Sequence, residues 1–196
     1  MRKIFIKRAL DIIASLLLII ASIPIWLFAI FIILLSDFGP IFFKQTRVGQ
    51  NLEPFEIYKF RTMKLNYDDN KTTKFNDKRV FKFGHVLRKY KIDELPQLIN
   101  VIGGDMSLVG PRPTSIDDVE KMSSIQKDRH TLKPGMTGLA QISGNTSLKW
   151  SERIKFDLYY VNNWTLYLDI KIMLKTFLQV LSGKADTHPL GGDEWN

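Results

Sequence analysis

The chain has 196 residues, of which 45% are hydrophobic and 24% charged, with 12 glycines, 8 prolines and no cysteine. This composition excludes a wholly disordered chain, a collagen-like fold and a disulfide-held fold, and the length allows one domain with at most a small addition. Because 28 basic residues oppose 20 acidic ones, we expect an anionic partner: a phosphorylated substrate, an anionic membrane surface or a polyanion. Thiol chemistry is excluded, and the three histidines lie too far apart in sequence to suggest a metal cluster.

A long apolar segment lies near the N-terminus. Residues 12–35 form a run of 24 without a charged side chain. As a straight helix this run reaches about 36 Å, which exceeds the roughly 30 Å hydrocarbon core of a bilayer. It is apolar on all sides, as is typical of an inserted helix. A signal peptide would share the basic start, but no small-residue cleavage site follows. We therefore predict a membrane anchor over residues 1–36.

Pro24, near the middle of this run, bears on whether the helix crosses the bilayer or returns. A proline removes one backbone hydrogen bond and favours a bend, and the hydroxyl of Ser22 is placed to bind a carbonyl freed there. Basic residues flank both ends of the run, so the positive-inside rule keeps both ends in the cytoplasm. A re-entrant hairpin satisfies both flanks, and a kinked spanning helix is the alternative.

After the anchor we expect a folded domain of the α+β class over residues 37–183, on the cytoplasmic side by the positive-inside rule, and a polar C-terminal tail over residues 184–196. Residues 41–48 and 55–61 are rich in β-branched and aromatic side chains. They are separated by Gly49-Gln50-Asn51, which predicts a small β-hairpin.

The second strand of this hairpin alternates in character. Tyr58 and Phe60 are apolar, whereas Lys59 and Arg61 are basic, so one face is apolar and the other basic. A solvated outer face is the ordinary interpretation of such a basic row. The polar residues 66–79 that follow are expected to form a mobile surface loop.

An adjacent acid pair, Asp93 and Glu94, lies in residues 81–102, which have helical apolar spacing that is interrupted before Pro96 and ended by two glycines. Neighbouring acids on a helix point about 100° apart, so they are not a pair of the glycosidase type, and such pairs are usually solvated. Two features favour a function. Pro96 gives the pair an irregular turn, and Arg88 can hold a phosphate by two parallel hydrogen bonds.

Arg112 stands between two prolines in a glycine-rich segment, so its backbone loses little entropy when the side chain binds an anion. A rigid turn whose arginine pairs with a carboxylate is the alternative. We expect Thr114 or Ser115 to cap a helix that continues through Arg129, followed by a tight turn at residues 133–138.

Two apolar stretches, residues 150–161 and 164–181, complete the domain. Such helices either cover a soluble core or lie in the headgroup plane of a membrane. The anchor elsewhere in the chain favours several amphipathic interfacial helices. Asp169 stands on an otherwise apolar helix and therefore needs a partner.

These motifs resemble those of the bacterial sugar transferases, in the minimal, catalytic-domain form of the monotopic polyprenyl-phosphate phosphoglycosyl transferases. The resemblance covers nearly the whole chain, with the motifs in order. The motifs are Lys7-Arg8 with Asp11, Phe42-Phe43-Lys44-Gln45-Thr46-Arg47, Tyr58-Lys59-Phe60-Arg61-Thr62-Met63, Asp93-Glu94-Leu95-Pro96-Gln97-Leu98, residues 104–113, residues 134–141, Tyr159-Tyr160-Val161 and Asp169-Ile170-Lys171.

The resemblance implies transfer of a sugar phosphate from a UDP-sugar to undecaprenyl phosphate with release of UMP, the first membrane step of a surface glycan such as a capsule, an O-antigen or a glycoprotein glycan. It implies that Asp93 forms a covalent aspartyl-phosphosugar and that Mg²⁺ is required. It further implies contact with membrane lipid at the cytoplasmic face of the bacterial inner membrane, no nucleic-acid partner, and leaves oligomer formation open. The family breaks its re-entrant helix at a Ser-Pro pair, whereas here Pro24 follows Ile23.

The chemistry of the residues agrees with this assignment. Attack by a carboxylate on a diphosphate is aided when a divalent ion bridges the phosphate oxygens and arginines take up developing charge. We assign Asp93 as nucleophile, and Glu94 as the group that assists the metal or the incoming phosphate. The substrate-binding candidates are Arg88, Arg112, Lys59 and Arg61, and the metal-binding candidates are Asp93 and Asp169.

Two other functions stay open at this point. One is a non-enzymatic, single-span membrane protein whose basic cytosolic domain binds anionic lipid or nucleic acid. The other is a membrane-tethered glycosyltransferase that moves the sugar without phosphate and releases a nucleoside diphosphate. The sequence does not identify the sugar, and the candidate positions for its pocket are residues 66–79 and 145–149.

Overall fold

The computed structural model describes residues 2–65 and 77–183, a mixed arrangement of helices and small sheets that confirms the α+β class. The tail at residues 184–196 and most of the expected loop at 66–79 lie outside the described residues. The elements, with 3₁₀ helices written η, are α1 (Arg2–Ser36), β1 (Phe42–Val48), η1 (Gln50–Leu52), β2 (Pro54–Phe60), α2 (Lys82–Lys89), η2 (Ile92–Glu94), α3 (Gln97–Gly103), β3 (Ser107–Val109), α4 (Ile116–Glu120), α5 (Ser124–Lys127), η3 (Asp128–Thr131), β4 (Gly135–Thr137), α6 (Leu139–Ile142), η4 (Asn145–Ser147), α7 (Trp150–Asn162) and α8 (Leu166–Leu181).

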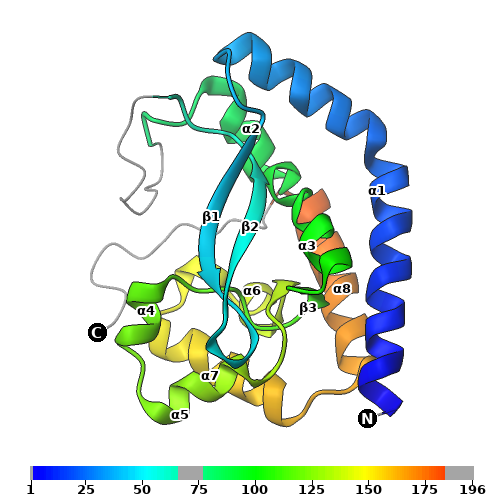
Figure 1. Cartoon of the computed structure of the whole chain (residues 1–196), viewed down its shortest axis with the longest axis vertical. Helices are drawn as coiled ribbons and strands as arrows, with labels where there is room; N and C mark the ends of the chain where they lie inside the picture. Colours follow the sequence, from blue (N-terminus) through cyan, green and yellow to red (C-terminus); the bar gives the residue numbers. More distant parts are fainter. Residues whose placement is uncertain (1, 66–76, 184–196) are drawn as a thin grey trace.

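The first element, α1, is one continuous helix of 35 residues with Pro24 inside it. It rises along one side of the molecule and bends across the top (Figure 1). A proline within a helix is a known cause of such a bend. The hydroxyl of Ser22 donates to the carbonyl of Ile19 at 3.2 Å, and not to the carbonyl of Ile20, which loses its donor at Pro24. The expected re-entrant helix hairpin is not confirmed by the structure, in which this segment is one bent helix.

By length and composition, α1 is the one helix within residues 2–65 and 77–183 that could cross a membrane. Much of its apolar surface faces away from the rest of the protein. Its most exposed large apolar side chains are Phe5, Leu17, Ile20, Leu27, Phe31 and Leu35.

The start of α1 is fastened to the domain that follows. The guanidinium of Arg8 donates to the backbone carbonyls of Val101 and Ile102, the latter at 2.8 Å. The carboxylate of Asp11, which is buried, accepts a hydrogen bond from the hydroxyl of Ser107 at 2.8 Å. These contacts bind the helix to the end of α3 and to β3.

The end of α1 is fastened to the same domain. Arg61, just after β2, donates from Nε to the carbonyl of Pro40 at 2.7 Å and forms an ion pair with Asp37. Ala29 and Ile33 of the helix are buried against Phe60 in one apolar cluster. Both ends of α1 therefore contact one folded body.

The predicted β-hairpin is confirmed. β1 and β2 pair antiparallel, with Phe43 opposite Lys59 and Arg47 opposite Phe55, and the short η1 joins them. Phe60 is buried against α1, and its ring stacks on that of Phe42 with 5.5 Å between centroids. The opposite face of the strand, which carries Ile57 and Lys59, is turned toward the main core, so the interpretation of this basic row as a solvated outer face is wrong.

The expected helix over residues 81–102 is interrupted once more than predicted. The predicted break before Pro96 and the stop at the glycines are present, with Gly104 in the left-handed conformation at φ 102°. The additional break falls at Tyr90 and Lys91, where Lys91 has φ 56°. A positive φ in a residue with a side chain ends helical hydrogen bonding, and no glycine or proline marks this position in the sequence.

The expected helix up to Arg129 is also divided, into α4, α5 and η3. The predicted cap is confirmed, because the hydroxyl of Ser115 accepts the backbone N–H of Asp118 at 3.2 Å. The prediction of one helix is wrong because Ser123 caps a second helix, with the side chain of Gln126 returning to its backbone N–H.

A second sheet, which the sequence did not suggest, pairs β3 and β4 in parallel. The expected turn at residues 133–138 contains β4. A Cβ on Gly135 would lie 2.0 Å from the backbone nitrogen of Gly110, so only glycine permits this approach. The main core cluster gathers residues from β2, α3, β3 and the position before it, α6, α7 and α8: Ile57, Leu98, Val101, Met106, Leu108, Val109, Ile142, Tyr160 and Ile172.

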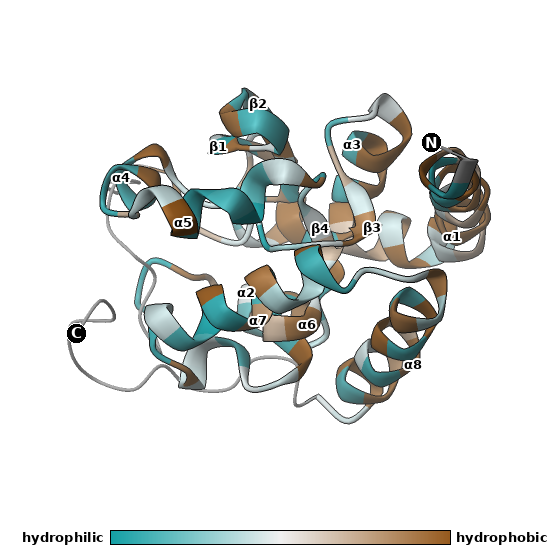
Figure 2. Cartoon of the chain, turned by 90° about the horizontal axis from the view of Figure 1, so that it is seen from below, coloured by the Kyte–Doolittle hydropathy of each residue, from teal (hydrophilic) through white to brown (hydrophobic). Residues whose placement is uncertain are grey.

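The two C-terminal helices differ in their surroundings. α7 turns Ile154 and Tyr160 into the core, so it covers a soluble core. α8 buries Ile172 but exposes a row of large apolar side chains, and it lies beside α1 at one edge of the molecule (Figure 2). The exposed row of α8 comprises Tyr167, Ile170, Met173, Leu174, Phe177, Leu178 and Leu181.

Candidate active site

The acid pair lies on η2, between α2 and α3, and it is buried. Asp93 and Glu94 are each 7% exposed, so the usual solvated interpretation does not apply. The left-handed Lys91 turns the chain immediately before the pair. Two apolar residues flank the acid pair. Ile92, before it, packs against the cluster that includes Ala29 of α1, and Leu95, after it, packs against both core clusters.

Glu94 is held by two cations from distant parts of the chain. Arg112 donates from Nη2 to Oε1 at 2.6 Å and from Nη1 to Oε2 at 3.4 Å, so it binds both carboxylate oxygens. Lys59, from β2, donates to Oε1 at 3.1 Å. Burial by itself would raise the pKa of Glu94, but the charges of Arg112 and Lys59 outweigh it and hold that pKa well below its usual value. Glu94 is therefore a fixed anion.

Asp93, unlike Glu94, has a carboxylate oxygen without a partner within residues 2–65 and 77–183, and a raised pKa. Its Oδ1 is buried and has no hydrogen-bond partner among the described residues. Burial, followed by the negative charge of Glu94, raises the pKa of Asp93 to about 6, against the opposing charges of Lys59, Lys91 and Arg88. A buried carboxylate oxygen without a partner is costly in the free protein, and a ligand that binds it removes the cost.

Arg88 reaches this cluster from the last turn of α2. Its Nε donates to the hydroxyl of Thr62 at 2.8 Å, which orients the guanidinium, and its charge acts on Asp93. Its two Nη atoms make no hydrogen bond within the part of the chain that the structure describes. Three of the predicted substrate-binding residues, Arg88, Lys59 and Arg112, therefore gather around the acid pair of Asp93 and Glu94.

Two predicted site residues have other surroundings. Arg61 is engaged with Asp37 and Pro40 at the end of α1. The carboxylate of Asp169 accepts from the ammonium of Lys7 at 2.7 Å, the hydroxyl of Tyr160 at 2.6 Å and the indole N–H of Trp164 at 3.0 Å. Asp169 thus has the partners that were expected for an acid on an apolar helix. These partners are Lys7, Tyr160 and Trp164, and Asp93 is not among them.

The segment that carries Arg112 is supported by a residue that sequence reasoning assigned no role. Arg129 is 2% exposed, and its Nη2 donates to the backbone carbonyl of Arg112 at 2.8 Å and to Asp157 at 2.6 Å. Asp157, also 2% exposed, lies on α7, 28 residues further along the chain. No spacing pattern in the sequence connects an arginine and an aspartate so far apart.

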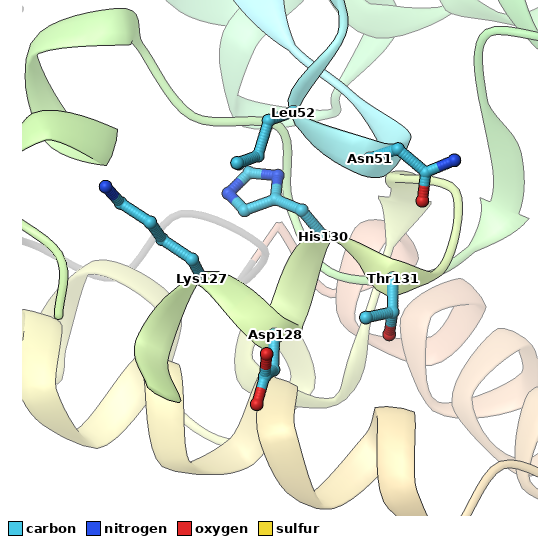
Figure 3. A pocket seen from close by; sticks show the side chains of 6 residues that line it. All are labelled: Asn51, Leu52, Lys127, Asp128, His130 and Thr131. Carbon is cyan, nitrogen blue, oxygen red and sulfur yellow. The ribbon is translucent and has the colours of Figure 1, made fainter. Parts of the chain in front are cut away.

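A hollow of about 200 Å³ lies elsewhere, at the hairpin tip. The side chains of Leu52 and His130 lie close together in it (Figure 3). Burial, then the charge of Arg129, lowers the pKa of His130 to about 4, so the ring is neutral, and its Nδ1–H donates to the carbonyl of Gly49 at 3.0 Å. The lining contains none of the predicted site residues: Asn51, Leu52, Lys127, Asp128, His130 and Thr131.

The acid pair fits a magnesium ion only if substrate phosphates and waters supply the other ligands. No group of three or more histidine or acidic residues suited to a metal occurs within the described ranges. Mg²⁺, however, usually binds one or two carboxylates together with waters and substrate phosphates. The unpartnered oxygen of Asp93, next to the carboxylate of Glu94, is compatible with such a shared site.

A buried acid pair surrounded by cationic side chains, close to a helix long enough to enter a membrane, is typical of a membrane-associated enzyme with an anionic substrate. The chain belongs to the bacterial sugar transferase family, whose sequence model matches residues 2–183. The expected family is thereby confirmed, and with it an enzyme of the transferase class. The non-enzymatic alternative is not favoured.

Several characterised and uncharacterised proteins are similar to the chain. It is 43% identical to the uncharacterised sugar transferase EpsL of Bacillus subtilis, over 90% of this chain and 87% of that protein. It is 40% identical to the exopolysaccharide production protein ExoY of Sinorhizobium fredii, over 87% of this chain and 83% of that protein. It is also 40% identical to the UDP-glucose:undecaprenyl-phosphate glucose-1-phosphate transferase of Escherichia coli, over 92% of this chain but 41% of that longer protein.

Proposed function

We propose that this protein transfers a sugar 1-phosphate from a UDP-sugar to undecaprenyl phosphate, releases UMP, and so starts the lipid-linked assembly of a surface glycan. The names of the relatives support this reaction class, and their names differ in the sugar: glucose, galactose and N-acetylgalactosamine. The observation that carries the proposal is the unpartnered, buried oxygen of Asp93 beside a second carboxylate that cations already neutralise.

In the proposed first step, a carboxylate oxygen of Asp93 attacks the phosphorus that bears the sugar. The bond from this phosphorus to the bridging oxygen breaks, and the electron pair leaves with UMP. In the second step, an oxygen of undecaprenyl phosphate attacks the same phosphorus, and the carboxylate of Asp93 is the leaving group. Arg88 and Lys59 are proposed to bind the phosphate oxygens, whose charge grows as the bond breaks.

Asp93 and Glu94 are proposed to hold Mg²⁺ together with the diphosphate, and the ion would supply charge neutralisation there. Because the pKa of Glu94 lies well below its usual value, this carboxylate is an anion at any working pH. Asp93 exchanges its proton near pH 6, so it too is mainly ionised at pH 7. Both carboxylates are therefore in the anionic form that a metal ligand requires.

The bent α1 is proposed to enter the cytoplasmic leaflet of the inner membrane and to return. Arg8 at its start and Asp37 beyond its end both contact the same folded body, at Ile102 and Arg61. A spanning helix would separate its two ends by the roughly 30 Å hydrocarbon core, and one domain on one side could not hold both. The exposed apolar row on α8 supports membrane contact at the same edge. The division into anchor and catalytic domain at residue 36 stays a prediction.

The first test is the identity of the nucleotide product. The purified protein is incubated with UDP-glucose, UDP-galactose and UDP-N-acetylgalactosamine in turn, with Mg²⁺ and undecaprenyl phosphate, and the nucleotides are separated by chromatography. We expect UMP with at least one sugar. Release of UDP instead would indicate the competing glycosyltransferase, which moves the sugar without its phosphate.

A further inference from the structure

Arg47 is a charged residue near the end of β1 to which the reaction outlined above gives no task. It lies on the same face of the hairpin as Lys59, because residues two apart along a strand, and residues directly opposite each other, share a face. On that face Ile57, 3% exposed, packs into the main core, and Lys59 contacts Glu94 at 3.1 Å. The face that carries Arg47 is therefore turned toward the interior and the acid pair.

The backbone next to Arg47 is tied to the segment that carries Arg112. The N–H of Val48 donates to the carbonyl of Thr114 at 2.9 Å, in an isolated antiparallel bridge two residues beyond Arg112. Burial, followed by the positive charge of Arg112, lowers the pKa of Arg47, while Asp118 and Glu94 act in the opposite direction. Two arginines therefore lie within electrostatic reach of one another at the site.

Arg47 lacks the counter-ion that such a position calls for. Its Nη2 donates to the amide oxygen of Gln45 at 2.6 Å, and no carboxylate among the described residues lies within 4.0 Å of it. A half-buried guanidinium paired only with a neutral amide, and repelled by a second arginine, is unfavourable in the free protein. An anion that binds between the two removes both costs, and phosphate oxygens accept well from arginine.

We propose that Arg47 is a phosphate-binding residue of the active site and acts beside Arg112. The identity of the ligand rests on the proposed function: the phosphate belongs either to the diphosphate of the nucleotide sugar or to undecaprenyl phosphate. Both sources offer the same chemistry, so the experiment separates them.

The test compares Arg47→Gln with Lys44→Gln in the full-length protein. Lys44 lies on the same strand but points to the other face, where it forms an exposed ion pair with Glu56, so this control removes the same charge outside the site. Calorimetric titration with UDP measures diphosphate affinity without catalysis. Steady-state kinetics then give KM for the UDP-sugar and for undecaprenyl phosphate.

For Arg47→Gln we expect at least one affinity to weaken about tenfold or more, since one charge-assisted contact is lost, and for Lys44→Gln no change. Weaker UDP binding identifies the diphosphate, and a raised KM for undecaprenyl phosphate alone identifies the acceptor. An Arg47→Gln protein with unchanged UDP affinity and both KM values unchanged overturns the proposal. Loss of UDP binding stands as a result even if the nucleotide product proves not to be UMP, so the two proposals fail separately.

Arg47→Lys covers the case in which Arg47→Gln does not fold. It keeps the charge but loses the planar fork, so we expect the same affinity to weaken about threefold to tenfold. A folded Arg47→Lys protein with unaltered UDP affinity and unaltered KM values also overturns the proposal.

Discussion

The guanidinium of Arg112 binds both carboxylate oxygens of Glu94, with 2.6 Å between Nη2 and Oε1. This ion pair separates two neighbouring acids into different roles. Glu94 stays charged, whereas Asp93, one residue earlier, has an oxygen without a partner and a pKa raised to about 6. The proposed nucleophile is therefore the acid with an oxygen that lacks a partner among the described residues.

Replacing Arg112 by alanine should impair catalysis without unfolding the protein. The substitution removes the main cation beside Glu94, so the pKa of Glu94 rises, and it removes a phosphate-binding group. We expect kcat/KM for the UDP-sugar to fall about 100-fold or more, the usual effect of losing a preorganised charge at a reacting group. Lys44→Ala, an exposed site on β1, serves as control, and equal activity of the two variants would contradict the assignment.

The pH dependence of UMP release should report the ionisation of Asp93. Below about pH 6 the carboxyl is protonated and cannot attack, so kcat/KM in the free enzyme should fall about tenfold per pH unit, and above this pH it should be level. Because the charge of Glu94 contributes to the raised pKa of Asp93, Glu94→Gln should move the acid limb to lower pH. An acid limb that stays at the same pH in Glu94→Gln would show that another group titrates.

The buried pair of Arg129 and Asp157 should matter for stability and for the position of Arg112. Arg129→Met leaves Asp157 buried and charged without its partner, which typically costs about 3–5 kcal/mol and should lower Tm clearly. The double variant Arg129→Met with Asp157→Leu removes both charges, so we expect Tm to recover. Activity should stay low, because the carbonyl of Arg112 still lacks its donor. Full recovery of activity would show that Arg129 does not position this segment.

The proposed re-entrant topology can be tested with introduced cysteines, because the chain has none. Lys3→Cys at the start of α1 and Lys82→Cys at the start of α2 are both exposed. In spheroplasts we expect a membrane-impermeant maleimide to label neither, and to label both once the membrane is opened. Labelling of Lys3→Cys alone in intact spheroplasts would establish a spanning helix. Pro24→Ala, which restores the missing N–H donor, should increase that labelling.

Local features of the chain could be predicted from sequence wherever a pattern was long enough. The apolar run gave α1, although the helix extends to Arg2 because charged residues flank the run without ending it. The two runs of β-branched and aromatic residues on either side of Gly49 predicted the hairpin correctly. The three-residue strands β3 and β4 carry no recognisable period, and the break at Lys91 has no glycine or proline to mark it. Both features arise from tertiary packing.

In the candidate site, too, some residues could be predicted from local motifs and others depend on tertiary contacts. Its acids and most of its cations are recognisable from the motifs, because the motifs carry the chemistry. Arg61 and Asp169 occur in those motifs too, yet their side chains serve packing at the two ends of α1. Arg47 ends one of these motifs, but its proposed role depends on the bridge that its neighbour Val48 forms with Thr114, far away in sequence. Arg129 depends in the same way on its contact with Asp157, which no local pattern predicts.

The most direct measurement of the central claim is the covalent state of Asp93 after incubation with UDP-sugar and Mg²⁺ in the absence of undecaprenyl phosphate. By mass spectrometry of the intact protein and its peptides, we expect a sugar phosphate on the peptide that contains Asp93, together with about one UMP per enzyme, since no acceptor completes the cycle. Addition of undecaprenyl phosphate should remove the adduct, and Asp93→Asn should form none. An Asp93→Asn protein that still releases UMP and makes the lipid product at the normal rate would contradict the account.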